Sequence, residues 1–310
     1  LLSGFVINYA YNDRWKEMTT ASFFKRRLIR LHPMLIMGAF IGLICFLIGG
    51  SEQWNGTKIP LYISIITFLL TCFMIPALPS SFNEIRGNGE LFPLNGPMWS
   101  LFFEYIGNIL YAIFIRRLST KLLTFVVILL GILHSIFTIG NLSGYGNLGV
   151  GWTFDTINFF GGMLRMLFPF TLGMLISRRF KAIKLPYPFL ICSILLIATL
   201  SMPYLSAFKA INFNGIYESF CITVIFPLIL IIGASSQEKS KLSQTLGELS
   251  YPLYIIHYPI MYIFYQWLIK TKQYTLSETY PVAILVVILS IVLAFILLKL
   301  YDKPLRQRLK

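Results

Sequence analysis

One carboxylate stands in the middle of a long apolar run. Residues 95–110 read NGPMWSLFFEYIGNIL, and Glu104 is the only charged side chain among them. In hydrocarbon an ionised carboxylate is costly unless it is paired or hydrated, so an acid at such a position is a candidate functional group. Trp99 and Ser100 precede it by about one helical turn, so one helix face would offer a ring, a hydroxyl and an acid. Alternatively, Glu104 makes a structural hydrogen bond or an ion pair, for example with Arg165, a second charge inside an apolar run.

Three arginines gather ahead of another apolar run. Residues 23–33 read FFKRRLIRLHP, and helical spacing puts Arg26 or Arg27 on the same face as Arg30. Guanidinium groups bind phosphate through paired hydrogen bonds, so these arginines are candidates for docking a phosphate-rich donor such as a nucleotide thioester. The alternative, which composition by itself favours, is a cytoplasmic anchor that contacts anionic lipid.

A stripe of phenols accompanies a histidine late in the chain. Residues 246–259 read LGELSYPLYIIHYP, in which Tyr251, Tyr254 and His257 recur every three residues and Tyr258 extends the same face. The stripe makes His257 a candidate catalytic residue and Tyr254 a candidate lining residue of a polar cavity. The competing interpretation is that His257 is a packing residue whose ring is satisfied locally.

The composition is that of an integral membrane protein. Of the 310 residues 56% are hydrophobic and only 12% are charged, with a mean hydropathy of +0.73. Soluble domains carry about 25% charged residues. The net charge of +14 would suggest nucleic acid as a partner in a soluble protein, but here it is explained by basic residues in cytoplasmic loops, and no nucleic-acid partner is expected.

The apolar runs predict an all-α, polytopic bundle of transmembrane helices. It forms a single domain over residues 1–310, with about nine or ten spans and a cytoplasmic C-terminus. Basic residues in segments 11–30 and 116–121 place both on the cytoplasmic side, so one of the runs 59–77 and 98–115 does not cross completely. The predicted complete or partial runs are residues 1–10, 31–50, 59–77, 98–115, 122–138, 157–176, 187–205, 216–232, 249–268 and 281–300.

Other features carry little chemistry. His134 stands alone in an apolar run and is expected to be a core residue. The four cysteines lie in apolar runs without paired spacing, and no metal-binding cluster is recognised, so no metal site is predicted. Gly38 and Gly42, four residues apart, indicate a close helix contact.

Three of the stretches described above, in this order along the chain, resemble the membrane acyltransferase-3 family. They are residues 23–33, 95–110 and 246–259. Its members are polytopic O-acyltransferases, many of which acetylate sugars of cell-surface polysaccharides. The chain departs from the family pattern at His32, where many members have Tyr, and at Tyr105, where many have a second acid. The matching residues are Ser3, Gly4, Phe5, Phe23, Phe24, Arg26, Arg27, Arg30 and Pro33, then Trp99, Ser100, Leu101 and Glu104, and finally Ser250, Tyr251, Tyr254, His257 and Pro259.

The resemblance implies transfer of an acyl group, with acetyl expected, from acyl-CoA to a hydroxyl of a cell-surface or exported carbohydrate. The partners are then the lipid bilayer, the acyl donor and the carbohydrate acceptor, with no permanently bound cofactor. The expected location is a bacterial inner membrane. In the family the first span carries a histidine thought to be the catalytic base. This sequence is expected to begin after that span.

In the implied mechanism the donor enters from the cytoplasm, with the three arginines near its phosphates. Glu104 orients the base or a nearby arginine. The residues expected to line the substrate cavity are Trp99, Ser100, Arg165 and Tyr254, together with His257. Two other classes of function stay open. A transporter or flippase of a lipid-linked sugar or small solute would also use intramembrane charges and broken helices. A scaffold without catalysis would tolerate replacement of the polar residues.

Overall fold

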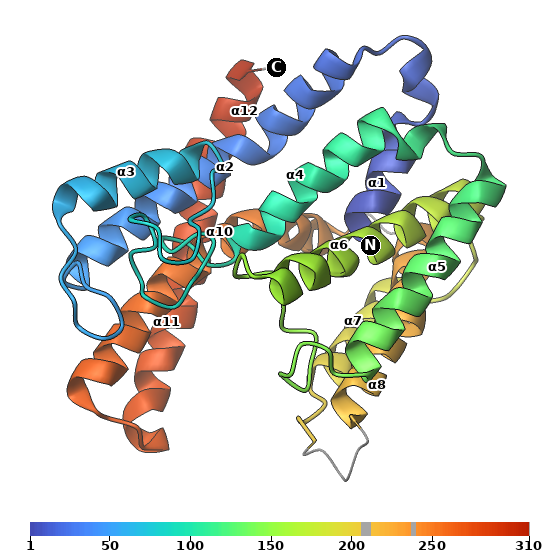
Figure 1. Cartoon of the computed structure of the whole chain (residues 1–310). Helices are drawn as coiled ribbons and strands as arrows, with labels where there is room; N and C mark the ends of the chain where they lie inside the picture. The colour runs from blue at the N-terminus through green and yellow to red at the C-terminus, as the bar shows by residue number, and fades with distance from the viewer. Residues whose placement is uncertain (206–211, 237–239, 310) are drawn as a thin grey trace. The chain divides into compact units, whose positions relative to one another are not determined.

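The described part of the chain consists of helices joined by loops. The computed structural model describes residues 1–205, 212–236 and 240–309, and within them the strand-like pairings are two isolated bridges. The all-α prediction is therefore confirmed (Figure 1). The helices are α1 (Leu2–Tyr11), η1 (Asp13–Lys16), α2 (Thr20–Ile48), α3 (Leu61–Cys72), α4 (Met98–Ile113), η2 (Ile115–Arg117), α5 (Thr120–Ile139), α6 (Thr156–Arg179), α7 (Pro188–Leu200), α8 (Phe213–Phe220), η3 (Cys221–Ile225), α9 (Phe226–Ser235), α10 (Lys241–Thr271), α11 (Leu276–Leu297), η4 (Leu298–Asp302) and α12 (Lys303–Leu309).

The helix lengths support a helical membrane protein. Within the described residues, five helical segments are long and apolar enough to cross a bilayer. Both candidates for the incomplete crossing are short, since α3 has 12 residues and α4 has 16. At about 1.5 Å per residue neither reaches the roughly 30 Å of a hydrocarbon core. The total of nine or ten spans stays a prediction. The five segments are Thr20–Ile48, Thr120–Ile139, Thr156–Arg179, Phe213–Ser235 and Leu276–Leu309.

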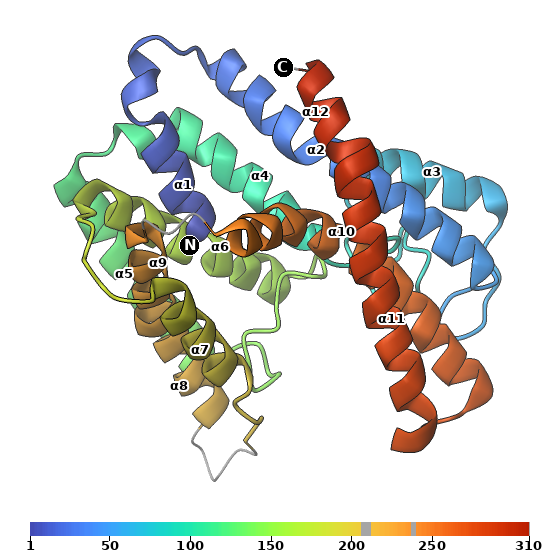
Figure 2. The ribbon, with the colours of Figure 1, turned by 180° about the vertical axis from the view of Figure 1, so that it is seen from behind.

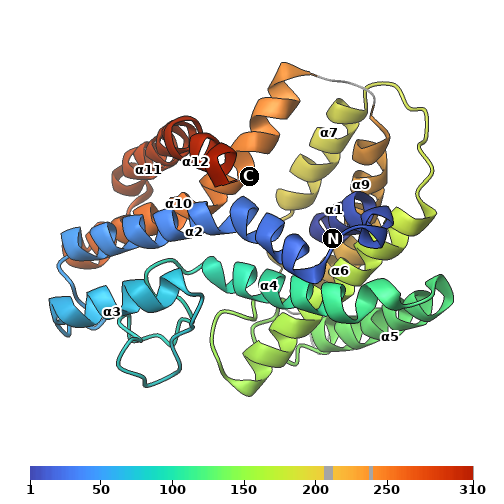
Figure 3. The same ribbon diagram turned by 90° about the horizontal axis from the view of Figure 1, so that it is seen from above.

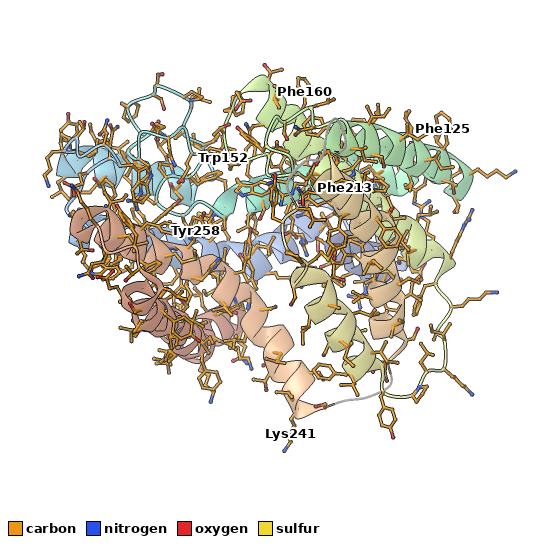
Figure 4. The ribbon with its side chains drawn as sticks, turned by 90° about the horizontal axis from the view of Figure 1, so that it is seen from below. Phe125, Trp152, Phe160, Phe213, Lys241 and Tyr258 are labelled. Carbon is orange, nitrogen blue, oxygen red and sulfur yellow. The ribbon has the colours of Figure 1, made fainter. Side chains whose placement is uncertain are left out.

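Large apolar side chains cover the outside of the long helices. Phe125 on α5 and Phe160 on α6 are both 62% exposed, and both lie at the surface in Figure 4. Contiguous exposed apolar surface of this kind is unfavourable in water and is matched by lipid.

The chain divides into two compact units. Unit 1 comprises Leu1–Thr20, Phe103–Gly151 and Asp155–Ser240, and unit 2 comprises Ala21–Phe102, Trp152–Phe154 and Lys241–Lys310. Each unit is therefore assembled from segments far apart in the sequence. The single domain over residues 1–310 stays a prediction.

In unit 1, α1 packs directly against α6 (Figure 1). A Cβ atom added at Gly4 would lie 2.0 Å from the carbonyl oxygen of Phe170, and one added at Gly173 would lie 2.1 Å from that of Leu1. The two backbones touch because glycine leaves room for them. α5 also packs against α6, while α7 and α9 lie side by side (Figure 2).

Unit 2 is built on α2 and on the hairpin of α10 and α11. A Cβ atom at Gly38 would lie 2.2 Å from the side chain of Ile255, and one at Gly42 would lie 2.3 Å from the carbonyl oxygen of Leu94. The predicted close contact at these glycines is therefore confirmed. α10 packs along α11, and α3 lies beside α2, where Phe40 and Phe68 have ring centroids 6.2 Å apart (Figure 3).

The basic segment before the predicted span at 31–50 is not a separate element. α2 begins at Thr20 and runs without interruption to Ile48, so the arginines occupy its first turns. Pro33 lies inside this helix. Hydroxyls from elsewhere in unit 2 bond to carbonyl groups near it: Tyr251 Oη donates to Leu31, and Tyr301 Oη donates to Pro33.

Candidate active site

Glu104 accepts a hydrogen bond from a hydroxyl on another helix of unit 1. Ser3 Oγ on α1 donates to Glu104 Oε1 on α4 at 2.8 Å. The carboxylate is half-buried. One turn further along α4 lies Asn108, which is buried and whose amide nitrogen and oxygen have no hydrogen-bond partner among the described residues. A buried polar group without a partner costs about 1–3 kcal/mol, so the neighbourhood of Glu104 holds unused hydrogen-bonding capacity.

Two features near Glu104 were not predicted, namely the buried amide of Asn108 and the contact of Ser3. Asn108 follows Glu104 by four residues, so its helical spacing was available as a signal. Ser3 entered only as part of a family pattern. Its contact with a residue 101 positions away has no local signature.

Arg165 is held against a loop of unit 1. It lies half-buried on α6, and its Nη1 donates to the carbonyl of Val150 at 3.0 Å. Arg165 also interacts electrostatically with Glu218 on α8 and with His134 on α5. The ion pair between Glu104 and Arg165 stays a prediction.

A cavity of about 460 Å³ in unit 1 includes Arg165 in its wall. Glu218 lies in the same wall and accepts a hydrogen bond from the backbone nitrogen of Leu148 at 2.6 Å. The sequence analysis assigned Arg165 to a substrate cavity but missed Glu218, which sits near the start of a predicted span.

Two predicted cavity residues meet in unit 2. Ser100 Oγ and Tyr254 Oη are 2.5 Å apart, and Tyr254 Oη also lies 3.0 Å from the carbonyl of Pro97, to which it donates. Trp99, the third predicted residue of this stretch, is half-buried on the same helix. The structure therefore joins the WSL segment to the tyrosine stripe, although 154 residues separate Ser100 from Tyr254.

The ring of His257 is oriented by its own helix. Its Nδ1 lies 2.9 Å from the carbonyl oxygen of Tyr254 and 3.1 Å from that of Leu253. A carbonyl can only accept, so Nδ1 is the donor in these two contacts. The rings of Tyr254 and Tyr258 flank it, with centroids 6.0 and 5.6 Å away. An imidazole that carries its single proton on Nδ1 has a lone pair on Nε2, which can accept a proton.

The three arginines of α2 do not share one environment. Arg26 and Arg30 are exposed and four residues apart, whereas Arg27 is 3% exposed and lies on the buried face with Phe23 and Leu31. Of the two alternatives, the structure therefore selects Arg26 with Arg30 as the exposed pair.

A second polar cavity, of about 800 Å³, lies in unit 1. Asn8, Arg116 and Arg178 are in its wall. Both guanidinium groups already donate hydrogen bonds to backbone carbonyls. Arg178 donates to Leu118 at 2.7 Å, and Arg116 donates to Ala112 at 2.7 Å. These arginines chiefly close the C-terminal end of α4 and its following turn.

Unit 2 contains a fully enclosed arginine that no sequence pattern predicted. Arg86 has no exposed surface, and its guanidinium carbon lies 4.3, 4.7 and 4.8 Å from the ring centroids of Tyr262, Phe46 and Trp54. Its Nε donates to the carbonyl of Pro93 at 3.0 Å, whereas Nη1 and Nη2 have no hydrogen-bond partner among the described residues. The aromatic rings compensate part of the cost of burying the cation.

Glu90 lies beside this arginine. It accepts a hydrogen bond from Tyr262 Oη, and another from Asn88 Nδ2 at 2.8 Å. Burial raises the pKa of Glu90, and the hydrogen bonds from Tyr262 and Asn88 and the charge of Arg86 offset only part of that rise. Arg86 and Glu90 belong to the irregular segment 73–97, where charged residues among Pro, Gly and Asn were the available signal.

The comparison with family models agrees with the motifs. The model of the acyltransferase-3 family, described as an acyltransferase domain, matches residues 1–299. Neither the comparison with curated proteins nor that with solved structures found a match.

Proposed function

Because this chain belongs to the acyltransferase-3 family, we propose that it moves an acyl group, in the first instance acetyl, from acyl-CoA to a hydroxyl of a cell-surface or exported carbohydrate. The family membership and the apolar helices establish a membrane acyltransferase. The donor, the acceptor and the bacterial inner membrane with a cytoplasmic C-terminus are parts of the proposal.

The observation that carries the proposal is the environment of Glu104. The carboxylate lies on an apolar helix and accepts a hydrogen bond from Ser3 on α1, and the amide atoms of Asn108, one turn away, have no hydrogen-bond partner among the described residues. A purely structural acid in such surroundings would be expected to exhaust the polar groups near it. Unused donors and acceptors beside a charge are what a bound reactant would complete.

The reaction balances without a further reactant. The acceptor oxygen attacks the thioester carbonyl, a C–O bond forms and the C–S bond breaks. The proton of the hydroxyl passes to a base and then to the departing thiolate. Glu104 orients the base or a nearby arginine, and positioned proton transfer of this kind contributes about 10²- to 10⁴-fold.

The base is an imidazole in this proposal. Within this chain His257 has the tautomer that leaves Nε2 as proton acceptor. Ser100 and Tyr254, joined by their short hydrogen bond, would line the reactant cavity with Trp99.

The donor phosphates are assigned to Arg26 and Arg30, because both are exposed on α2 and share a face. Arg27 then has a supporting role from the buried face. Acetyl transfer by membranes containing the full-length protein tests this assignment. Arg30→Ala should raise the KM for acetyl-CoA about tenfold, whereas Lys25→Ala, which removes the same charge from the same exposed segment, should change it less than twofold.

The transporter alternative predicts something different. Proteoliposomes containing that protein would take up or flip a solute in the absence of acyl-CoA. If no acetyl ester forms on envelope carbohydrate while such uptake occurs, the acyltransferase proposal is wrong.

A further inference from the structure

Unit 1 contains a cavity of about 460 Å³ whose wall carries one arginine and one acid (Arg165 and Glu218). Its volume lies within the usual range for small-molecule sites, roughly 300–1,000 Å³. It is lined by α6, by α8, by η3 and by the segments around residues 147–149 and 199–204. The charge rule puts the loop at 140–156 on the non-cytoplasmic side, where an exported acceptor would arrive.

The chemistry of the wall favours a neutral, hydroxyl-rich ligand. Arg165 and Glu218 have opposite charges and interact with each other electrostatically, so the wall has no excess of either sign. A phosphate or another anion would gain from the arginine and lose to the acid. A sugar hydroxyl, by contrast, can donate to a carboxylate and accept from a guanidinium.

Glu218 has capacity to accept more than one hydrogen bond. Its Oε2 accepts from the backbone nitrogen of Leu148 at 2.6 Å, and a carboxylate has about four lone-pair sites. A neutral donor group entering the cavity would give Glu218 a further hydrogen bond. Tyr217 Oη, in contrast, is already committed to the carbonyl of Thr199 at 2.8 Å, so that residue contributes mainly its ring.

Aromatic faces accompany these polar groups. Tyr204, which is 65% exposed, and Tyr217 both line the cavity. A pyranose ring has an apolar face of C–H groups and an edge of hydroxyls. Amphipathic rings next to a small number of charged groups match both.

We propose that this cavity binds the acceptor, as a neutral pyranose unit of the carbohydrate, with Glu218 and Arg165 holding its hydroxyls and Tyr204 covering its apolar face. The inference rests on the proposed function and adds the place and the substrate class of the acceptor. It assigns Glu218 and Tyr204 to acceptor binding.

The test measures acetyl transfer by the full-length protein in membranes. Acetyl-CoA is the donor, and the chemically deacetylated envelope polysaccharide of the host is the acceptor, each varied in turn. Glu218→Gln and Tyr204→Ala should each raise the KM for the acceptor about tenfold, the value of one charge-assisted hydrogen bond or one aromatic contact. The KM for acetyl-CoA should change less than twofold.

Two control variants lie close to the tested residues without lining the cavity. Ile216→Ala alters an exposed residue of α8, and Leu205→Ala alters the exposed neighbour of Tyr204. Both should leave the two KM values unchanged. Tyr204→Ala changes an exposed side chain and should fold normally, which melting curves of the purified variants would verify.

The outcomes separate the two proposals. If the wild type transfers acetyl groups and neither cavity variant changes the KM for the acceptor, the acceptor site is wrong and the proposed function stands. If the wild type forms no acetyl ester, the proposed function fails, and the acceptor site fails with it. An equal rise of both KM values would assign Glu218 and Tyr204 a structural role instead.

Discussion

Glu104 in unit 1 and Glu90 in unit 2 are both half-buried carboxylates, but their environments differ. Glu90 accepts hydrogen bonds from Tyr262 and Asn88 and lies near the enclosed cation of Arg86. Glu104 accepts a hydrogen bond from Ser3 and lies one turn from Asn108, whose amide atoms have no hydrogen-bond partner among the described residues.

Under the proposed function the difference separates an acid that stabilises structure, Glu90, from one that takes part in the reaction, Glu104. The surroundings of Glu90 are filled by parts of unit 2 itself, and burial favours its neutral form. Glu104 lies one turn from Asn108, whose amide atoms have no hydrogen-bond partner among the described residues. The two acids should therefore respond differently to the same substitution.

The largest difference should appear in activity. Glu104→Gln should reduce acetyl transfer by about 10²-fold or more, because the neutral amide cannot orient a charged partner. Glu90→Gln, the matched change, should retain most of the activity. Transfer assays with equal amounts of folded protein measure both, and a Glu104→Gln variant that keeps full activity would remove Glu104 from the mechanism.

The free energy of unfolding should depend more on the surroundings of Glu90 than on those of Glu104. Arg86→Leu should lower the free energy of unfolding by about 3 kcal/mol or more, because it removes a buried cation from three rings and leaves Glu90 without it. Lys299→Leu is the control, since Lys299 lies over Phe295 but is exposed. Melting curves in detergent compare the two. Equal, small shifts would show that the Arg86 cluster contributes little.

The hydroxyl that binds Glu104 should have an intermediate effect. Ser3→Ala removes a hydrogen bond to a carboxylate and should reduce transfer about tenfold. Ser3→Thr keeps the hydroxyl and should restore most of the rate. If both variants behave alike, the contact between Ser3 and Glu104 does not assist the reaction.

Glu90 should give stability a characteristic pH dependence. Its pKa is raised in the folded protein, so its contribution is fully present below the ordinary value of 4.5 and is lost as the pH rises through the folded pKa. The melting temperature of Glu90→Gln relative to the wild type should therefore increase between pH 5 and pH 8. A constant difference across this range would contradict the raised pKa.

The smallest effect concerns His134, which is fully buried and has no hydrogen-bond partner for either ring nitrogen among the described residues. Its ring lies tilted against the ring of Phe168, with ring centroids 5.2 Å apart. His134→Phe removes two unsatisfied polar atoms and should leave the stability unchanged or raise it by about 1 kcal/mol. A loss of stability in thermal unfolding would show that the imidazole has a structural role.

Much of the fold could be predicted from the sequence because apolar runs have a direct local meaning. The helices α5 (Thr120–Ile139) and α6 (Thr156–Arg179) lie within a few residues of their predicted bounds. α2 begins at Thr20, and Thr20 or Ser22 as a cap was the local signal for a helix running into the membrane from the basic segment. The enclosed Arg86 was missed because an irregular segment has no periodicity that reports burial.

Composition and motif order by themselves determined that this is a helical membrane protein of the acyltransferase-3 family, because hydropathy and short-range spacing depend only on neighbouring residues. Tertiary structure decided which polar groups meet. Ser3 binds Glu104 across 101 positions, Ser100 meets Tyr254 across 154, and Tyr262 reaches Glu90 across 172. Such partners are chosen by how helices pack, and packing depends on contacts that a linear pattern does not contain.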